Sequence, residues 1–346
     1  MSEEEYPMEL RVLMAIFLIL IIVVGLLGNS LICWTLYRNK ELRKTLNNWF
    51  ILNMAFADIG VVIFAVYFPL RTYINGYWDF SSAACQFNGF LNSQLMLASI
   101  LTLTMISLHQ YFTVVSKWPQ PRLRRAAVIM LVYIWLHSTI LSILPLSGIT
   151  KYDLKNGRGQ CAVKIPETAG EKLTAMGYIV TGFFIPLVIM SFSYYRIMKI
   201  VSIHARRVSR MSNSASIDRK AMQKQVVITM IIVLILFLLC WSPFLVMSLL
   251  GAFVPALSNP ILANLAFLLG FANSCCNPIV LGFRNRAFKM EYMQVYEKFK
   301  DVLCPGRMQE KPVSPSVVVV TSSVDVSDLS VVYTNTDVAN SKVVIM

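Results

Sequence analysis

Charged residues are scarce in this chain of 346 residues. Asp, Glu, Lys and Arg make up 14% of it and apolar residues 56%, which is far from the composition of a soluble domain. Histidine is scarcer still: His109, His137 and His204 stand far apart, with no cysteine at a zinc-binding spacing. The sequence also lacks a glycine-rich phosphate-binding loop. These absences argue against a soluble enzyme, although the length alone would allow about two or three soluble domains.

What the chain has instead is seven long apolar stretches. A membrane-crossing helix needs about 20 mainly apolar residues, and each stretch carries few or no charges. Buried helices of a soluble protein usually keep a polar face, so we expect an all-α membrane protein, a seven-transmembrane helix bundle. The stretches run over residues 8–36, 46–73, 84–115, 126–146, 173–200, 226–253 and 257–283.

Lys and Arg gather in alternate connections, after the first, third, fifth and seventh stretches, over residues 38–44, 117–125, 206–220 and 284–289. Connections rich in Lys and Arg stay in the cytoplasm, so the N-terminus with Glu3, Glu4 and Glu5 is expected outside. The net charge of +13 then reflects membrane topology, not affinity for nucleic acid. The first apolar stretch is too long for a cleavable signal peptide, and we expect an uncleaved anchor of a multi-pass plasma-membrane protein.

The chain has seven cysteines. Only Cys85 and Cys161 fall on the expected outer side, where an oxidising compartment should pair them and pin the long outer loop over the bundle. Cys304 lies inside, past the last apolar stretch, and is either a palmitoylation site or a plain reduced thiol. Four others lie within apolar stretches, where a small buried hydrophobe is the expected role: Cys33, Cys240, Cys275 and Cys276.

Several short motifs follow one another at a characteristic spacing. They are "GNS" at residues 28–30, "LNMAFADIG" around Asp58, Trp135, "FFIP" ending at Pro186, "FLLCWSPF" with Trp241 and Pro243, "NSCCNPIV" with Pro278, and "FRNRAFK". With the cysteine pair, they make the chain resemble a rhodopsin-like (class A) G-protein-coupled receptor over about residues 10–303, near the opsin, amine and melatonin-type receptors. The resemblance implies an outer N-terminus (1–7), the bundle (8–283), a short amphipathic eighth helix (284–303) and a disordered cytoplasmic tail (304–346).

Asp58 stands within the second apolar stretch. A carboxylate at membrane depth is costly, so it should face the bundle interior and have partners there. The resemblance implies a hydrated pocket that binds a sodium ion as an allosteric ion; a hydrated carboxylate without a cation is the alternative. The implied partners of Asp58 are Asn29, Ser99, Asn273, Ser274 and Asn277.

Pro243 and Pro278 lie inside apolar stretches, where each removes a backbone hydrogen bond and so provides a hinge. The resemblance makes the stretch around Trp241 and Pro243 the element that moves on activation. It also places Ile100, Pro186 and Phe237 in the family's packing switch below the ligand. Taken alone, these three would be ordinary core residues.

The resemblance implies a ligand site between the outer halves of the third, fifth, sixth and seventh helices. Asn92 stands where amine receptors carry an aspartate, which argues against a monoamine, and Phe271 stands where opsins carry the lysine that binds retinal, so no retinal cofactor is expected. The site would suit a neutral lipid-like or indole-like ligand, or none, while charges in the outer loop leave a peptide open. The matching residues are Asn92, Met96, Tyr178, Gly182, Phe244, Leu245, Phe267 and Phe271.

The third apolar stretch ends on "HQY", His109, Gln110 and Tyr111, where the family has an acid, an arginine and an aromatic residue. Gln223, at the matching foot of the sixth helix, is also neutral, so the ion pairs that hold the family's inactive state cannot form. Leu281 replaces the tyrosine of the family's "NPxxY" motif, and Tyr194 thereby loses its usual partner.

These departures have opposite effects on activation. Loss of the ion pairs should favour the open state, whereas loss of the arginine and the tyrosine removes contacts that stabilise the open state. A half-hydrated ion pair contributes only about 0.2–1 kcal/mol, whereas a charge-assisted hydrogen bond made on opening contributes about 1.5–3 kcal/mol. We therefore expect weakened coupling to heterotrimeric G proteins, or signalling through arrestin. The alternatives are a constitutively active receptor and, in another class, a transporter or channel; the latter predicts internal repeats or paired broken helices, and the sequence shows neither.

Phosphorylation sites are expected in two cytoplasmic segments. Arg206, Arg207 and Ser209 form an R-R-x-S site for a basophilic kinase, where phosphate would alter partner docking; a merely solvated loop is the alternative. The polar tail offers sites for arrestin recognition at Thr321, Ser322, Ser323 and Ser327.

Overall fold

The computed structural model describes residues 6–155, 159–164, 166–208, 214–254 and 259–303. Within them lie seven helical spans that are long and apolar enough to cross a membrane, which confirms the predicted fold class. The spans are Met8–Arg38, Leu46–Asn75, Ser82–Val114, Gln120–Ser147, Ala169–Ile203, Ile231–Gly251 and Ile261–Arg284.

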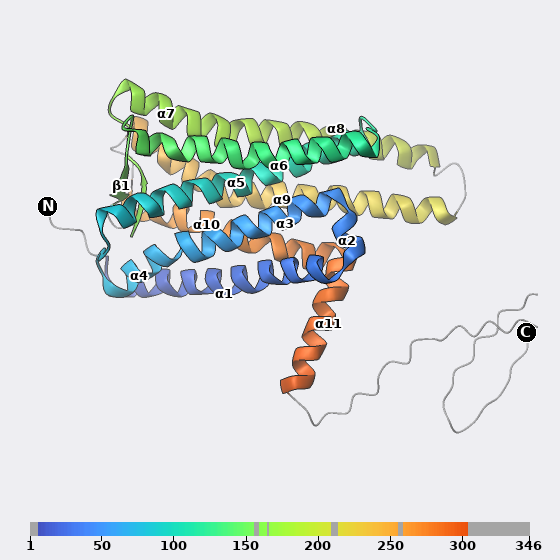
Figure 1. Ribbon diagram of the computed structural model, residues 1–346, viewed down its shortest axis with the longest axis horizontal. Coiled ribbons are helices and arrows are strands. Elements are labelled where there is room, and N and C mark those ends of the chain that lie inside the picture. The colour runs from blue at the N-terminus through green and yellow to red at the C-terminus, as the bar shows by residue number, and fades with distance from the viewer. Residues whose placement is uncertain (1–5, 156–158, 165, 209–213, 255–258, 304–346) are drawn as a thin grey trace, which may run out of the picture. The chain divides into compact units, whose positions relative to one another are not determined.

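The membrane-spanning helices lie side by side along one axis (Figure 1). The central helix α5 packs against α3, α6 and α8, and α10 packs against α1 and α9. The α-helices are α1 (Met8–Arg38), α2 (Lys40–Lys44), α3 (Leu46–Gly60), α4 (Tyr67–Asn75), α5 (Ser82–Val114), α6 (Gln120–Ile143), α7 (Ala169–Ile179), α8 (Ile185–Val208), α9 (Ser214–Phe253), α10 (Pro260–Arg284) and α11 (Arg286–Leu303).

Two spans contain a widened, π-helical turn just before a proline. In η1 (Val61–Ala65) the amide of Val66 donates to the carbonyl of Val61, and in η3 (Val180–Phe184) the amide of Ile185 donates to that of Val180. Pro69 and Pro186 follow these turns. Because proline has no amide hydrogen and its ring crowds the preceding turn, the helix locally relaxes its pairing. A third, tighter turn, η2 (Leu144–Ser147), ends the α6 span.

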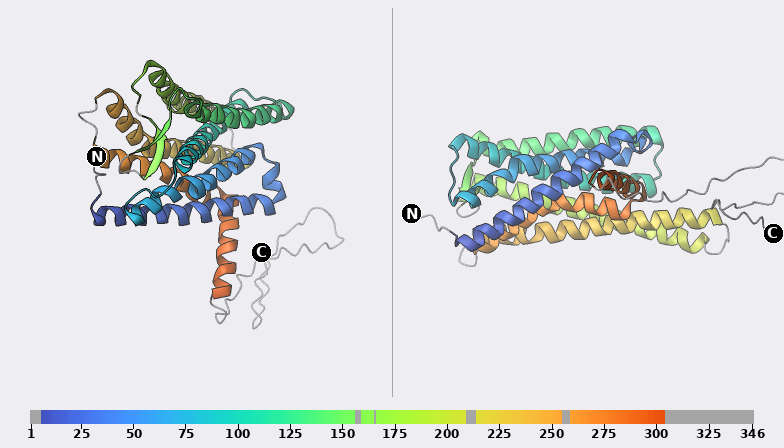
Figure 2. Two further views of the ribbon diagram at one scale, coloured as in Figure 1. Left: turned by 60° about the vertical axis from the view of Figure 1, so that its left-hand side comes forward. Right: turned by 90° about the horizontal axis from the view of Figure 1, so that it is seen from below.

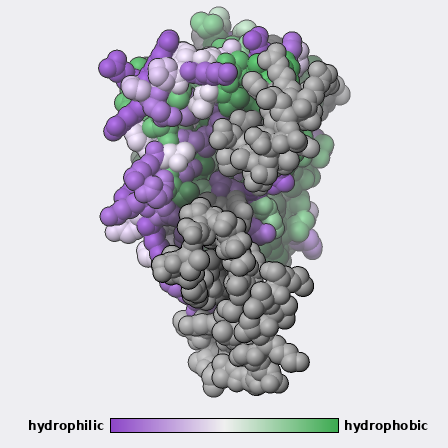
Figure 3. Space-filling view, turned by 90° about the vertical axis from the view of Figure 1, so that its right-hand side faces the viewer, coloured by the Kyte–Doolittle hydropathy of each residue, from purple (hydrophilic) through white to green (hydrophobic). Residues whose placement is uncertain are grey.

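The two ends of the bundle differ. At one, the hairpin end, strands β1 (Tyr152–Lys155) and β2 (Gln160–Val163) pair antiparallel, with Leu154 opposite Cys161. At the other, the basic end, α2 joins α1 to α3 (Figures 1 and 2). Hydrophilic side chains gather over part of the basic end and apolar side chains border them (Figure 3).

The fourth membrane span starts earlier than its apolar stretch, because charged residues occupy the first turns of α6. The prediction placed the fourth membrane segment at residue 126, but α6 begins at Gln120. Pro119 precedes the helix and Pro121 lies in its first turn, where proline is tolerated. Arg122, Arg124 and Arg125 are exposed on its first turns, so the helix extends beyond its apolar part.

The short eighth helix is α11. Its Phe288 is fully buried and packs against a cluster that includes Ile32, Leu36, Ile51 and Ala55 of α1 and α3. The same cluster takes up Leu281 and Tyr292 as half-buried members. The first turns of α11 are thereby held by apolar contact with α1 and α3.

Candidate functional site

The inward face of α5 carries the first part of the expected ligand site. Asn92 and Met96 lie one turn apart and are both buried. The Oδ1 atom of Asn92 has no hydrogen-bond partner among the described residues. Because a buried amide oxygen normally finds a partner, Asn92 offers an acceptor to a water or a ligand.

An aromatic row continues the site across α9 and α10. Trp241 and Phe244 meet edge to face with ring centroids 6.0 Å apart, Phe244 and Phe267 at 5.4 Å, and Phe267 and Phe271 at 4.9 Å. Phe267 and Phe271 are buried, and Leu245 packs against the same core. The structure therefore brings these predicted residues together into a largely apolar wall.

Two predicted ligand residues lie toward neighbouring helices instead. The hydroxyl of Tyr178 donates to the carbonyl of Leu141 in α6, at 2.6 Å. A methyl group added at Gly182 would lie 2.9 Å from a methyl of Leu97 in α5. Both residues thus hold the span α7–η3–α8 against α5 and α6.

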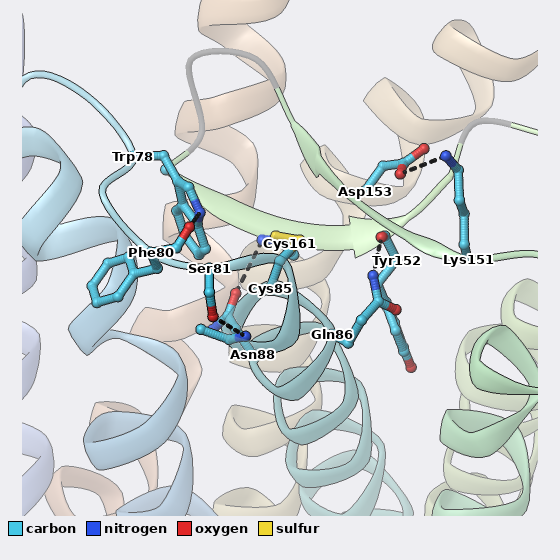
Figure 4. The surroundings of a disulfide bond; sticks show 12 residues. Trp78, Phe80, Ser81, Cys85, Gln86, Asn88, Lys151, Tyr152, Asp153 and Cys161 are labelled. Atoms are coloured by element: carbon cyan, nitrogen blue, oxygen red, sulfur yellow. Dashed lines mark hydrogen bonds and ion pairs between the residues drawn. A yellow bond between two sulfur atoms is a disulfide. The ribbon is translucent and has the colours of Figure 1, made fainter.

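The hairpin is fastened to the start of α5 (Figure 4). The predicted disulfide joins Cys85 to Cys161, with Cα atoms 5.3 Å apart. The amide of Cys161 also donates to Asn88 Oδ1 at 3.0 Å, and Gln86 Nε2 donates to the carbonyl of Tyr152 at 2.7 Å. The hairpin loop is therefore fastened to the start of α5 at several points, and the predicted disulfide is confirmed.

Tyr152 is the site residue that the sequence did not reveal. Its side chain is 1% exposed, its ring lies against Gly89, and its hydroxyl donates to the carbonyl of Ser142 at 2.9 Å. Burial raises the pKa of Tyr152 above its ordinary value. A tyrosine in a polar loop carries no local signal of this insertion, because only the hairpin's placement directs it into the bundle.

Asp58 is fully buried among hydrogen-bond donors from two other helices. It accepts from Ser99 Oγ at 2.9 Å, Ser274 Oγ at 3.0 Å and Asn277 Nδ2 at 2.8 Å. Asn29 instead donates to the carbonyls of Gly25 and Ser274, both at 2.9 Å. Asn273 lies on α10 next to Ser274 and is also buried. Among the described contacts, no hydrogen bond joins Asn273 to Asp58.

The oxygen atoms around Asp58 fit a small hard cation. Carboxylate, hydroxyl and amide oxygens are the ligands that such cations take, and the buried Oδ1 of Asn29 lacks a partner among the residues described. The same three donors also satisfy the carboxylate by themselves. This arrangement is compatible with a bound sodium ion and also with a hydrated carboxylate without a cation, the two alternatives that the sequence left open.

The expected packing switch lies directly below the aromatic row. Ile100, Phe237 and Trp241 belong to one buried cluster, Pro186 is buried, and Phe237 stacks on Phe183 with centroids 5.6 Å apart. Pro243 and Pro278 both lie inside their helices, α9 and α10. The packing at this level joins α5, η3, α8 and α9, so movement of one of these elements requires the others to repack.

The neutral triplet ends the α5 span at the basic end. His109 is buried, its ring centroid is 5.5 Å from that of Phe50, and neither ring nitrogen has a partner in the described part of the chain. Gln110 Nε2 donates to Asn47 Oδ1 of α3 at 3.0 Å, and the Tyr111 ring lies against Phe192 at 5.7 Å. Gln110 is thus held by a neutral hydrogen bond.

The other expected coupling residues are apolar or buried. Leu281 packs into the cluster around Phe288, and Tyr194 of α8 is 4% exposed. The side chain of Gln223 lies outside the described side chains, and so do the phosphorylation and lipidation residues Ser209, Cys304, Thr321, Ser322, Ser323 and Ser327.

Comparisons with known proteins bear on this arrangement. Residues 28–281 match the family described as "7 transmembrane receptor (rhodopsin family)". Squid rhodopsin has a similar fold, with a TM-score of 0.76 and 24% identity over 89% of this chain and 90% of that one.

Curated receptors from vertebrates are also similar along most of their length. Rat (Rattus norvegicus) somatostatin receptor type 5 is 30% identical over 87% of this chain and 80% of its own. The Danio rerio melatonin receptor type 1B-B is 28% identical over 82% and 81%, and the Cavia porcellus histamine H2 receptor is 31% identical over 83% and 80%. The chain therefore belongs to the rhodopsin family of seven-transmembrane receptors, and it is a receptor and not an enzyme.

Proposed function

We propose that this receptor lies in the plasma membrane with its hairpin end outside and responds to a neutral, largely apolar ligand. The aromatic row of Phe244, Phe267 and Phe271 supplies an apolar wall, and Asn92 supplies a free acceptor in place of a charge. A wall of this kind with a single polar group suits an uncharged molecule. The relatives named for somatostatin, melatonin and histamine differ in ligand, so they leave the ligand's identity open.

The intracellular partners follow from membership of the family. A heterotrimeric G protein and arrestin are the proposed partners, and both would bind at the basic end. Sodium is the proposed ion at Asp58, and the proposal is supported by the hydroxyls of Ser99 and Ser274 that contact this carboxylate and by the buried Asn29 Oδ1, which has no partner among the described residues. Bound sodium would stabilise the unactivated bundle.

Weak coupling to the G protein is the distinctive part of the proposal. The observation that carries it is the hydrogen bond from Gln110 to Asn47 at 3.0 Å. Gln110 stands where the family carries the arginine that contacts the G protein, and here its side chain makes a neutral hydrogen bond to Asn47 of α3. Leu281, packed beside Phe288, offers no hydroxyl to Tyr194. Contacts that stabilise the open state are therefore missing.

The test restores both groups. Gln110→Arg, alone and with Leu281→Tyr, should raise G-protein signalling above a low wild-type baseline, by about tenfold if one charge-assisted hydrogen bond of about 1.5 kcal/mol is regained in the open state. Signalling is measured for each G-protein family at equal surface expression. Thr113→Arg is the matched control, because it adds the same charge to an exposed position of the same helix end.

Two results would contradict weak coupling. One is high basal signalling of the wild type that the substitutions leave unchanged or lower, which would indicate a constitutively active receptor. The other is an equal gain from Thr113→Arg, which would assign the effect to charge alone. Recruitment of arrestin by the wild type, recorded in the same cells, measures the second proposed route.

A further inference from the structure

Two cysteine side chains meet inside the bundle, where α9 packs against α10. Cys240 of α9 is buried, and Cys276 of α10 is half-buried. Their thiol groups are hydrogen-bonded to each other. The Cys276 thiol donates its own hydrogen to the carbonyl of Ala272 at 3.4 Å, so the hydrogen between the two sulfur atoms belongs to Cys240. We call these two residues the α9–α10 dithiol.

The α9–α10 dithiol is held together by the packing of its two helices. A methyl group added at Gly270 of α10 would lie 3.7 Å from the ring of Trp241, the residue that follows Cys240. The aromatic row joins the same two helices toward the hairpin end. Cys240 belongs to the main buried core cluster, and Cys276 packs against that cluster. The two sulfur atoms are therefore neighbours because two packed helices place them so.

Cys275, the residue before Cys276, is directed toward a different helix. Its thiol donates to the carbonyl of Ile21 in α1 at 3.5 Å. Successive side chains of an α-helix point in directions about 100° apart, so Cys275 and Cys276 face different neighbours. Both are half-buried residues of α10. Cys275 is therefore a matched comparison, with the same helix and similar burial but a different partner.

Two neighbouring thiols can be joined by one two-electron oxidation, and hydrogen peroxide is an oxidant that supplies it. Transfer of a peroxide oxygen to the half-buried Cys276 sulfur forms an S–O bond, breaks the O–O bond and releases one water. The Cys240 sulfur then attacks the Cys276 sulfur, so that the S–S bond forms and the S–O bond breaks. The leaving hydroxide takes up the Cys240 thiol proton as a second water. The pair loses two electrons, which the peroxide takes up.

We propose that the α9–α10 dithiol is a site of reversible oxidation by peroxide, which converts Cys240 and Cys276 into a disulfide that ties α9 to α10. A disulfide keeps the Cα atoms of its two residues within about 7 Å of each other. Cys240 lies beside Trp241 and one turn from the hinge at Pro243, so the bond would restrain α9 and keep the bundle closed. This consequence for signalling rests on the proposed movement of α9, whereas the oxidation itself does not.

The test exposes the full chain, purified in detergent, to hydrogen peroxide, blocks the remaining thiols by alkylation and identifies peptides by mass spectrometry. Chymotrypsin cleaves after Phe244 and Phe267, so Cys240 and Cys276 fall in different peptides that only a disulfide keeps together. The cross-linked peptides should appear in the wild type and disappear on treatment with dithiothreitol. Cys276→Ser should reduce their yield at least about tenfold, whereas Cys275→Ser, the matched control, should leave it unchanged within about twofold.

Thermal unfolding gives a second readout that does not depend on signalling. Oxidation should raise the unfolding temperature of the wild type and of Cys275→Ser by about 5 °C, because a cross-link restricts the unfolded chain. Cys240→Ser cannot form the bond and should show no such rise. Dithiothreitol should return the oxidised wild type to its original unfolding temperature.

Several results would overturn the proposal. One is free Cys240 and Cys276 thiols in the peroxide-treated wild type, and another is sulfinic acid at Cys276 without a cross-link. A cross-link that Cys275→Ser removes would assign the bond to the wrong pair. An equal rise of the unfolding temperature in Cys240→Ser would show that no bond ties α9 to α10. The assays use no ligand and no G protein, so failure of the proposed function leaves them unaffected.

Discussion

At the scale of single residues, Asp58 shows how far a sequence can define a polar site. A carboxylate in an apolar stretch needs partners, and Ser99, Ser274 and Asn277 provide them at 2.8–3.0 Å. Their chemical types could be anticipated from the family motifs. The partners of Asn29 could not be anticipated: it donates to the carbonyl of Gly25 one turn earlier in α1 and to the carbonyl of Ser274, which the packing of α1 on α10 brings within reach.

The sodium proposal has a direct test in stability. Sodium should raise the unfolding temperature of the intact receptor relative to potassium, with a stabilisation of about 1.4 kcal/mol at ten times the dissociation constant. Asp58→Asn should abolish the difference between the two ions, because it removes the charge that holds the cation. Asp153→Asn, a change at a half-exposed position of the hairpin, should keep the sodium response. Equal unfolding temperatures of the wild type in both salts would count against the ion.

Asp79 provides a pH-dependent contact outside the membrane spans. Arg71 donates to it at 2.7 Å, and this hydrogen bonding, with the neighbouring positive charge, lowers the pKa of the Asp79 carboxyl despite some desolvation. A lowered pKa means that the contact stabilises the fold above the unfolded-state value of about 3.9 and is lost as the pH falls through the folded value.

The expected difference in unfolding temperature between the wild type and Asp79→Asn is therefore constant above about pH 5 and disappears at lower pH. Thermal unfolding in detergent from neutral to acidic pH measures it. Asp153→Asn serves as the control, since its partner Lys151 is an exposed lysine at 3.2 Å. If the difference in unfolding temperature between wild type and Asp79→Asn grew as the pH fell, the contact would not stabilise the fold through the charged Asp79 carboxylate.

At the scale of elements, the long apolar stretches predicted where the membrane spans lie, but they did not predict the irregular turns within the spans or the residues at which the helices begin. Helix α6 begins six residues before its apolar stretch because Pro119 and Pro121 favour a helix start there, while three arginines masked it from hydropathy. The π-helical turns before Pro69 and Pro186 depend on how each helix re-pairs its freed carbonyls. That choice is made by neighbouring helices, not by the local sequence.

The contact between the hairpin and α5 predicts a strong effect of a small change. A methyl group at Gly89 would lie 2.4 Å from the Tyr152 ring, which is closer than any ordinary contact. Gly89→Ala should lower the free energy of unfolding by about 1–3 kcal/mol, the cost of overpacking a core. Tyr152→Leu in the same chain should recover part of this loss.

The matched control for this substitution is Gly177→Ala. Gly177 lies in α7, and an added methyl group meets nothing within 4 Å there. Alanine is preferred to glycine in a helix by about 1 kcal/mol, so this change should be neutral or stabilising. Thermal unfolding of the purified variants measures both, and equal behaviour of the two glycine variants would show that Tyr152 does not occupy the position against α5.

At the scale of the whole molecule, the distribution of Lys and Arg predicts the orientation. Lys and Arg cluster in the connections at the basic end, over residues 38–44, 117–125, 206–220 and 284–289. Short connections that are rich in Lys and Arg remain cytoplasmic. An epitope tag at the N-terminus should therefore be labelled on intact cells, and a tag at the C-terminus only after permeabilisation. Labelling of the C-terminal tag on intact cells would reverse the topology and, with it, the proposed side for G-protein binding.

The sequence by itself determined the seven spans, the paired outer cysteines and the motifs that place this chain in its family, because these depend on hydropathy, compartment and local spacing. It also determined the neutral charge of His109, Gln110 and Tyr111. Only the tertiary structure decided that Gln110 bonds to Asn47, that Tyr152 enters the bundle beside Gly89, and that the thiols of Cys240 and Cys276 meet. Each of these contacts joins residues far apart in the chain, and their geometry follows from how whole helices pack, which no local pattern encodes.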